Sequence, residues 1–215
     1  MKVKSLMNPM SSCSMPPVIR LCLGALLGFC STAGAAIIHV DLTASPLVIP
    51  NSLDGLYLNF VTGAASTAPI PSTGWDFNPY NRGDGLAFFS PDLPAGQGMF
   101  ASGTTALALL GGETIGSTSL YQSGQVLGTP FHSSGVRFTG FRFQNEATGQ
   151  LNYGWAQLTS TGGGTAAGFP ASLLGYAYDN TGASLTAGQV PEPHNSWMLA
   201  IPGLALLFRR KGRHS

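Results

Sequence analysis

VRFTGFRF (residues 136–143), LNYGWAQLT (residues 151–159) and SLLGYAY (residues 172–178) decide the fold of this chain. Apolar and polar side chains alternate along each segment, and such alternation predicts β-strands. The alternation of the first segment slips near Gly140, and we interpret this slip as a β-bulge. A short turn and a glycine-rich loop separate the segments, so we expect the three strands to form an antiparallel meander.

Three segments further upstream also predict strands, at residues 37–42, 53–61 and 85–90. Residues 64–73 and 117–135 carry few charges and predict long surface loops. The chain has 29 glycines in 215 residues, and no segment has a long helical periodicity. We therefore predict an all-β fold class, with a single antiparallel β-sandwich domain of jelly-roll-like type over residues 36–189.

Residues 1–35 have the organisation of a signal peptide. A basic region precedes an apolar run at residues 21–29, and Ala33, Gly34 and Ala35 supply the small residues of a cleavage site. The basic residues are Lys2, Lys4 and Arg20. We expect the Sec machinery and signal peptidase to act on this segment, so that the mature chain begins at Ala36 or Ile37.

Residues 190–215 have the organisation of a C-terminal sorting tail. The tail begins with a Pro-Glu-Pro motif, continues with an apolar run at residues 197–208, and ends in a basic cluster. The motif is Val190, Pro191, Glu192 and Pro193, and the basic cluster is Arg209, Arg210, Lys211 and Arg213. A helix over residues 196–208 would span only about 20 Å, against a hydrocarbon core of about 30 Å. We expect a short transmembrane helix that anchors the chain transiently, with its basic end in the cytoplasm.

The motif, the short apolar segment and the basic end resemble the sorting signal of PEP-CTERM proteins of Gram-negative bacteria. Residues 140–143, 153–158 and 175–178 also resemble a block that precedes this signal in many PEP-CTERM proteins. The resemblance implies that an exosortase-type membrane protease processes the chain at Pro191, Glu192 and Pro193. It also implies a final location at the cell surface or outside the cell, in association with exopolysaccharide or biofilm matrix.

Charge is divided unevenly between the two ends and the predicted domain. Seven of the ten basic residues lie in the two predicted signals, which leaves three arginines against eight acidic residues and a net charge of about −5 for residues 36–190. Binding of nucleic acid requires clustered Lys and Arg, so we expect no nucleic-acid partner.

Candidate catalytic and metal-ligating groups are sparse. The three cysteines, Cys13, Cys22 and Cys30, all lie in the predicted signal peptide, so the mature domain has neither disulfides nor thiolate ligands. Its two histidines are His39, within a predicted strand, and His132. The sequence lacks the Gly-x-Ser-x-Gly, His-Glu-x-x-His and Walker-type motifs. We expect no catalytic residues, no metal site and no cofactor.

An aromatic and polar segment is the candidate for glycan binding. Trp75, Asp76 and Tyr80 could contact a sugar ring, because an aromatic face suits its apolar face and a carboxylate accepts from its hydroxyl groups. Packing of these side chains in the core is the alternative. The nearby Arg82, Gly83 and Asp84 are typical of a turn.

Two functions remain open from the sequence. The first is a non-catalytic surface or matrix protein that associates with exopolysaccharide. The second is a secreted carbohydrate-active enzyme of the glycoside hydrolase type, whose acid and base would come from Asp76, Asp84, Glu113 and Glu146. We prefer the first, because it requires only a stable β-sandwich and an export address.

Overall fold

The computed structural model describes residues 37–68, 74–92, 96–163 and 166–192. The predicted signal peptide, Pro193, the apolar run and the basic cluster lie outside the described residues. Within the described part the protein is all-β, and its only helical element is a 3₁₀ turn, η2, at Thr129–Phe131. The predicted all-β fold class is therefore confirmed. No helix in the described ranges has the length and apolar character needed to cross a membrane.

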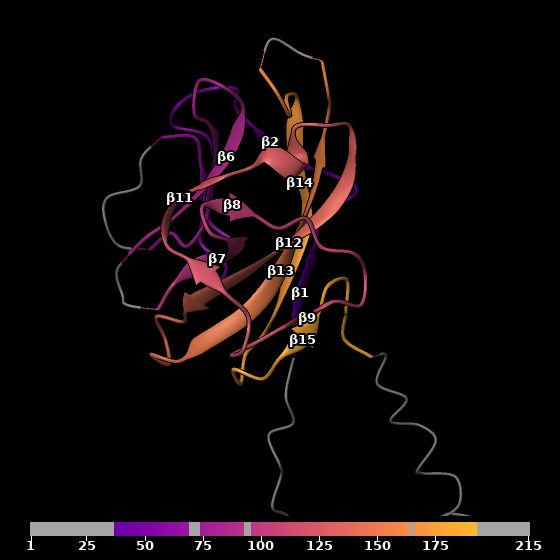
Figure 1. Ribbon diagram of the computed structural model, residues 1–215. Helices are drawn as coiled ribbons and strands as arrows, with labels where there is room; N and C mark the ends of the chain where they lie inside the picture. The colour runs from indigo at the N-terminus through magenta and orange to yellow at the C-terminus, as the bar shows by residue number, and fades with distance from the viewer. Residues whose placement is uncertain (1–36, 69–73, 93–95, 164–165, 193–215) are drawn as a thin grey trace, which may run out of the picture. The chain divides into compact units, whose positions relative to one another are not determined.

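The main sheet of the described chain has eleven strands, nine of them in one continuous order (Figure 1). That order is β1 (Ile37–Asp41), β14 (Ala171–Asp179), β13 (Leu151–Ser160), β12 (Gly135–Gln144), β7 (Gly98–Ser102), β8 (Thr105–Ala106), β11 (Gly124–Leu127), β6 (Leu86–Ser90) and β5 (Asn78–Asn81). The two others are β2 (Leu47–Ile49), which pairs with β14, and β10 (Tyr121–Gln122), which pairs with β7. Two small sheets pair β3 (Tyr57–Leu58) with β4 (Ala65–Ser66) and β9 (Thr114–Ile115) with β15 (Leu185–Thr186). The contact between β8 and β11 is parallel, so the main sheet is mixed rather than purely antiparallel as predicted.

The predicted meander is confirmed as strands β12, β13 and β14. The predicted bulge near Gly140 is wrong, because β12 and β13 keep an unbroken register from Gly135↔Ser160 to Gln144↔Leu151. The irregularity lies instead between β13 and β14, next to Gln157. Both faces of β12 are apolar, so its aromatic residues occupy alternate faces and no slip in the strand is required.

Two hydrophobic clusters lie on opposite faces of the meander. The main core contains Phe141, Leu158 and Tyr176, and it also receives Phe88 from β6 and Val126 from β11. Strands from distant positions in the sheet order thus contribute to one cluster, because the sheet curls around it. The second cluster contains Tyr153, Trp155, Ala177 and Leu185, with Phe138 packed against it. The two-stranded sheet formed by β9 and β15 supplies part of its cover through Ile115 and Leu185.

Two of the upstream predictions need correction. Residues 53–61 form only the two-residue strand β3, because residues 51–54 form bends and residues 60–62 turn away from the strand. Residues 117–135 are not one long loop, since they contain β10, β11 and η2. Val126 of β11 is fully buried opposite Phe88, and this packing fixes the strand although the surrounding sequence is rich in glycine and serine.

Candidate functional site

The chain leaves the folded domain at Gln189, immediately before the predicted sorting motif. The Gln189 amide donates to the Thr186 carbonyl oxygen over 2.9 Å, and the Gln189 side-chain oxygen accepts from the Thr186 amide over 2.9 Å. The indole Nε1 of Trp155 donates to the Gln189 carbonyl oxygen over 3.0 Å. Val190 is 45% exposed, and the next two residues of the motif, Pro191 and Glu192, are exposed as well.

The Trp155 ring is buried and contacts side chains of β12 and β1. It is 3% exposed, lies edge-on to Phe138 at 5.3 Å between ring centroids, and lies 5.6 Å from the His39 ring of β1. Its cross-strand neighbour is Gly140. A side chain at that position would place its Cβ 2.9 Å from the Phe100 side chain, so the absence of a side chain lets β12 pack closely here. The first strand and the C-terminal segment therefore meet at one buried indole.

The predicted glycan-binding residues do not share one surface. Trp75 is half-buried, whereas Asp76 is 3% exposed and Tyr80 is 9% exposed. Residues in an extended segment alternate between faces, so Trp75 and Asp76 point away from each other. The arrangement follows the core-packing alternative for Asp76 and Tyr80, and leaves Trp75 as the accessible member.

Trp75 belongs to a surface aromatic cluster with Tyr57 of β3 and Phe89 of β6. The Trp75 ring is edge-on to Tyr57 at 5.2 Å and tilted to Phe89 at 5.8 Å, and all three side chains are half-buried. Burial raises the pKa of Tyr57, and the nearby Asp54 carboxylate adds to this effect. Sequence reasoning missed Tyr57 and Phe89, because they reach Trp75 only through the folding of separate segments.

Asp76 organises the turn at residues 59–64 from inside the protein. Its Oδ2 accepts from the Phe60 amide over 2.8 Å. Burial raises its pKa from 3.8 to about 7, the bond from Phe60 opposes the rise, and the Glu146 carboxylate adds to it. Glu146 in turn accepts from the Asn59 side-chain amide over 2.6 Å. The two carboxylates thus lie near each other, each held by a group of the same turn.

The other two candidate carboxylates have separate local partners. Glu113 accepts from the Leu110 amide at the start of the β9 segment. Asp84 pairs with Arg82 in the turn between β5 and β6. The four carboxylates therefore do not converge on one site, although the Glu146 carboxylate contributes to the raised pKa of Asp76.

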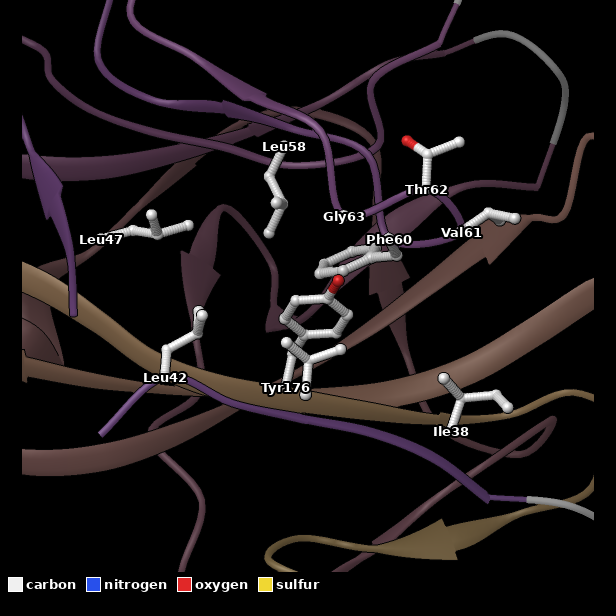
Figure 2. Close-up of a pocket in the computed structure, with 10 residues that line it drawn as sticks. Ile38, Leu42, Leu47, Leu58, Phe60, Val61, Thr62, Gly63 and Tyr176 are labelled. Atoms are coloured by element: carbon white, nitrogen blue, oxygen red, sulfur yellow. The ribbon is translucent and has the colours of Figure 1, made fainter. Parts of the chain in front are cut away.

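A mainly apolar hollow of about 290 Å³ lies between β1, β14 and residues 58–63 (Figure 2). Its lining includes Ile38 and Val40 of β1, Leu58 and Phe60, and the ring of Tyr176 from β14. Sequence reasoning missed this hollow, because its walls are far apart in the chain.

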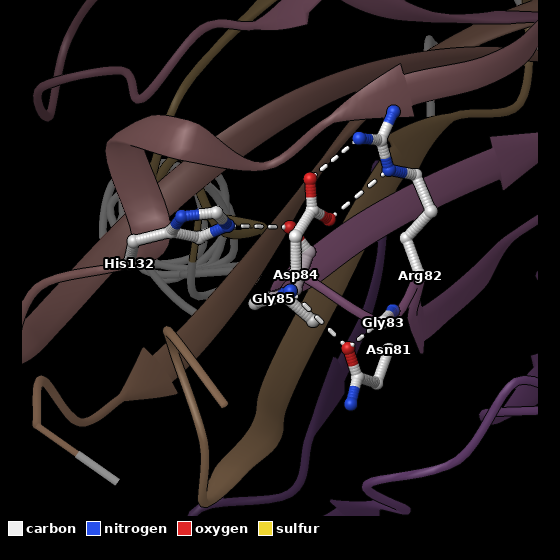
Figure 3. A network of polar contacts seen from close by, with 7 residues as sticks. Asn81, Arg82, Gly83, Asp84, Gly85 and His132 are labelled. Carbon is white, nitrogen blue, oxygen red and sulfur yellow. Dashed lines mark hydrogen bonds and ion pairs between the residues drawn. The ribbon is translucent and has the colours of Figure 1, made fainter. Parts of the chain in front are cut away.

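The Arg82 turn is a compact polar network (Figure 3). The Asn81 side-chain oxygen accepts from the amides of Gly83 and Gly85 over 2.8 and 3.2 Å, while Arg82 Nε donates to Asp84 over 3.0 Å. The salt bridge with Arg82 lowers the pKa of Asp84. His132 contacts the Leu86 carbonyl oxygen through Nε2 over 2.9 Å, so the histidine fastens η2 to the sheet. The interpretation of this segment as a turn is confirmed.

No group of three or more His, Cys, Asp or Glu side chains suited to a metal ion occurs within the described ranges. Comparison with known proteins finds no matching family model, no similar curated protein and no similar solved structure.

Proposed function

We propose that this chain is an exported, non-catalytic surface or matrix protein that is sorted through a PEP-CTERM signal. The observation that carries the proposal is the exit of the chain at Gln189. The last hydrogen bonds of the described C-terminal segment involve Gln189, and Val190, Pro191 and Glu192 are exposed immediately afterwards. A protease needs an accessible, extended substrate, and proline disfavours the helical conformation of the residue before it. The position of the motif supports recognition by an exosortase-type membrane protease.

The N-terminal strand of the described chain supports removal of a signal peptide. Strand β1 begins at Ile37 and pairs with β14 from its first residue, Ile37↔Asp179. Cleavage by signal peptidase after Ala35 would leave every residue of that pairing in the mature chain. Export by the Sec machinery, transient anchoring by the C-terminal helix and final location at the cell surface or outside the cell follow from this proposal.

We further propose that the curled sheet is a single β-sandwich of jelly-roll-like type. The main core supports this interpretation, because it combines Phe141 and Leu158 from the meander with Phe88 and Val126 from strands at the other end of the sheet order. Such a core lies between two layers of strands in a sandwich. The fold would then rest on burial alone, with no disulfide in residues 36–189.

The surface aromatic cluster supports association with exopolysaccharide. Trp75, Tyr57 and Phe89 present partly exposed rings beside the Asp54 carboxylate. Aromatic faces and adjacent acceptors suit the apolar face and the hydroxyl groups of a sugar. Among the four candidate carboxylates, Asp76 is buried and Asp84 and Glu113 are committed to local bonds, which favours binding over hydrolysis.

Intact-mass measurement with C-terminal peptide mapping tests the proposed sorting. The chain is expressed in a Gram-negative host with an exosortase and in the same host without it. We expect cleavage near residues 191–193 only in the first host. Glu192→Ala should abolish this cleavage, whereas Asp92→Ala, which removes another exposed carboxylate, should not. A chain that ends at Ser215 in both hosts would refute the proposal.

A further inference from the structure

We propose that the hollow beside β1 binds an uncharged small molecule that has an aliphatic chain and a single hydrogen-bonding oxygen. This proposal is independent of the sorting signal and of the surface aromatic cluster. It rests on the lining of the hollow and on the phenol hydroxyl group of Tyr176, which belongs to that lining.

The walls of the hollow favour an aliphatic chain. The side chains of Ile38, Val40, Leu42, Leu47, Leu58 and Val61 are all aliphatic and line it. Its volume of about 290 Å³ corresponds to roughly ten groups of the size of a water molecule, at ~30 Å³ each. When an aliphatic chain enters this hollow, apolar surface of the chain and of the walls is removed from water, and this burial favours binding.

Tyr176 supplies the polar end of the site. The residue is 1% exposed, and it is the one tyrosine among the described side chains that line the hollow. Figure 2 shows this hydroxyl directed toward Phe60 and Gly63. Gly63 has φ +70° and lies beside this hydroxyl, because a Cβ added there would contact the hydroxyl oxygen at 3.4 Å. The glycine therefore places no side chain against the oxygen. A hydroxyl group beside aliphatic walls can donate a hydrogen bond to a ligand oxygen.

Electrostatics select an uncharged ligand. None of the described residues that line the hollow is charged. Burial raises the pKa of Tyr176 to about 12, with smaller contributions from Tyr178 and Asp76, so the phenol keeps its proton and can donate it in a hydrogen bond. An anionic head group would face no cation here, and it would also be disfavoured by the neighbouring Asp76 carboxylate. An alcohol, ester or lactone oxygen meets these conditions, whereas a fatty acid anion does not.

Saturation-transfer NMR on the full 215-residue chain tests the site with three probes of equal chain length: 1-octanol, octanoate and octylammonium. We expect 1-octanol to bind at least tenfold more tightly than either ion. Each added methylene should increase the affinity about fourfold until the hollow is full, the equivalent of about 0.8 kcal/mol. Tyr176→Phe should weaken 1-octanol binding by about two- to tenfold, the range expected for one neutral hydrogen bond.

Two tryptophan variants separate the hollow from general surface binding. Val61→Trp adds bulk at a partly buried loop residue of the lining and should abolish binding. Val48→Trp adds the same bulk at a 66% exposed position of β2 that is not part of the lining, and should leave binding unchanged. Equal affinity of octanoate and 1-octanol, or unaltered binding by Val61→Trp, would overturn the proposal. Binding that emerges only after removal of residues 193–215 would assign the hollow to an apolar segment of the chain itself and would also overturn it.

Discussion

Replacement of Asp76 by asparagine should remove a dependence of stability on pH that originates in the core. Asp76 is 3% exposed and accepts one hydrogen bond from the Phe60 amide. Asparagine keeps an oxygen for that bond and has nearly the same shape, but it carries no charge at any pH. The substitution therefore isolates the cost of the buried charge from the loss of a contact.

The direction in which stability changes with pH follows from the raised pKa of Asp76. Burial, reinforced by Glu146, raises the pKa of Asp76 from 3.8 to about 7 in the folded protein. The folded state thus binds this proton more tightly than the unfolded state, and the resulting stabilisation is fully present below pH 3.8. It is lost as the pH rises to about 7. The difference between the two pKa values corresponds to roughly 4 kcal/mol at full ionisation.

Urea unfolding of the wild-type chain and of Asp76→Asn at pH 4, 6 and 8 measures the effect. Near pH 4 the aspartic acid of the wild type and the asparagine of the variant are both neutral in the folded state. The difference in free energy of unfolding at this pH therefore reports the cost of replacing the carboxyl group by an amide. Between pH 4 and pH 8 the free energy of unfolding of the variant should rise relative to the wild type by about 2–4 kcal/mol. Asp84→Asn is the control, since its exposed carboxylate has a lowered pKa and should produce no such rise. A stability difference for Asp76→Asn that stays constant from pH 4 to pH 8 would refute this reasoning.

Three further predictions concern the chain exit, the surface aromatic cluster and a close backbone contact. Trp155→Phe removes the donor to Gln189, so hydrogen exchange of residues 185–189 should accelerate about fivefold, for one hydrogen bond of about 1 kcal/mol, while β12 stays protected. Trp75→Ala should weaken retention on exopolysaccharide in affinity electrophoresis by severalfold, and unchanged retention would exclude the cluster as the glycan site. Gly55→Ala should destabilise the protein by more than about 2 kcal/mol in urea unfolding, because its Cβ would lie 2.2 Å from the Pro79 carbonyl oxygen at φ +62°. Gly83→Ala, at a positive φ with open space around it, should cost about 1 kcal/mol.

The meander could be predicted from sequence because its strands are long and neighbours in the chain. Tyr153 and Trp155 alternate with small residues in the sequence, and both lie in the second cluster, on one face of β13. The slip at Gly140 was misinterpreted, because alternation identifies faces only when one face is polar. Phe138 and Phe141 lie on opposite faces, and each face is covered by its own cluster.

The short strands could not be predicted, because their positions depend on partners distant in the chain. Val126 is buried through its pairing with Phe88, and a four-residue strand between glycines carries little local signal. The same limit applies to the candidate sites. Trp75 could be singled out as an aromatic residue beside polar ones, but its neighbours Tyr57 and Phe89 come from other strands, and the hollow is formed by walls from four segments.

The two faces of β14 separate the two proposals physically. Tyr176 points into the main core and lines the hollow, whereas the next residue, Ala177, lies in the second cluster with Trp155. Successive residues of a strand point to opposite faces, so a ligand bound at Tyr176 contacts neither Trp155 nor the chain exit that it holds. Both β1 and the segment that ends at Gln189 nevertheless border the second cluster through His39 and Trp155. Tyr176→Phe should therefore change ligand affinity without changing cleavage at residues 191–193, and Trp155→Phe should have the opposite effects. If either variant altered both properties, the two faces would be coupled through β14, and the sites could not act independently.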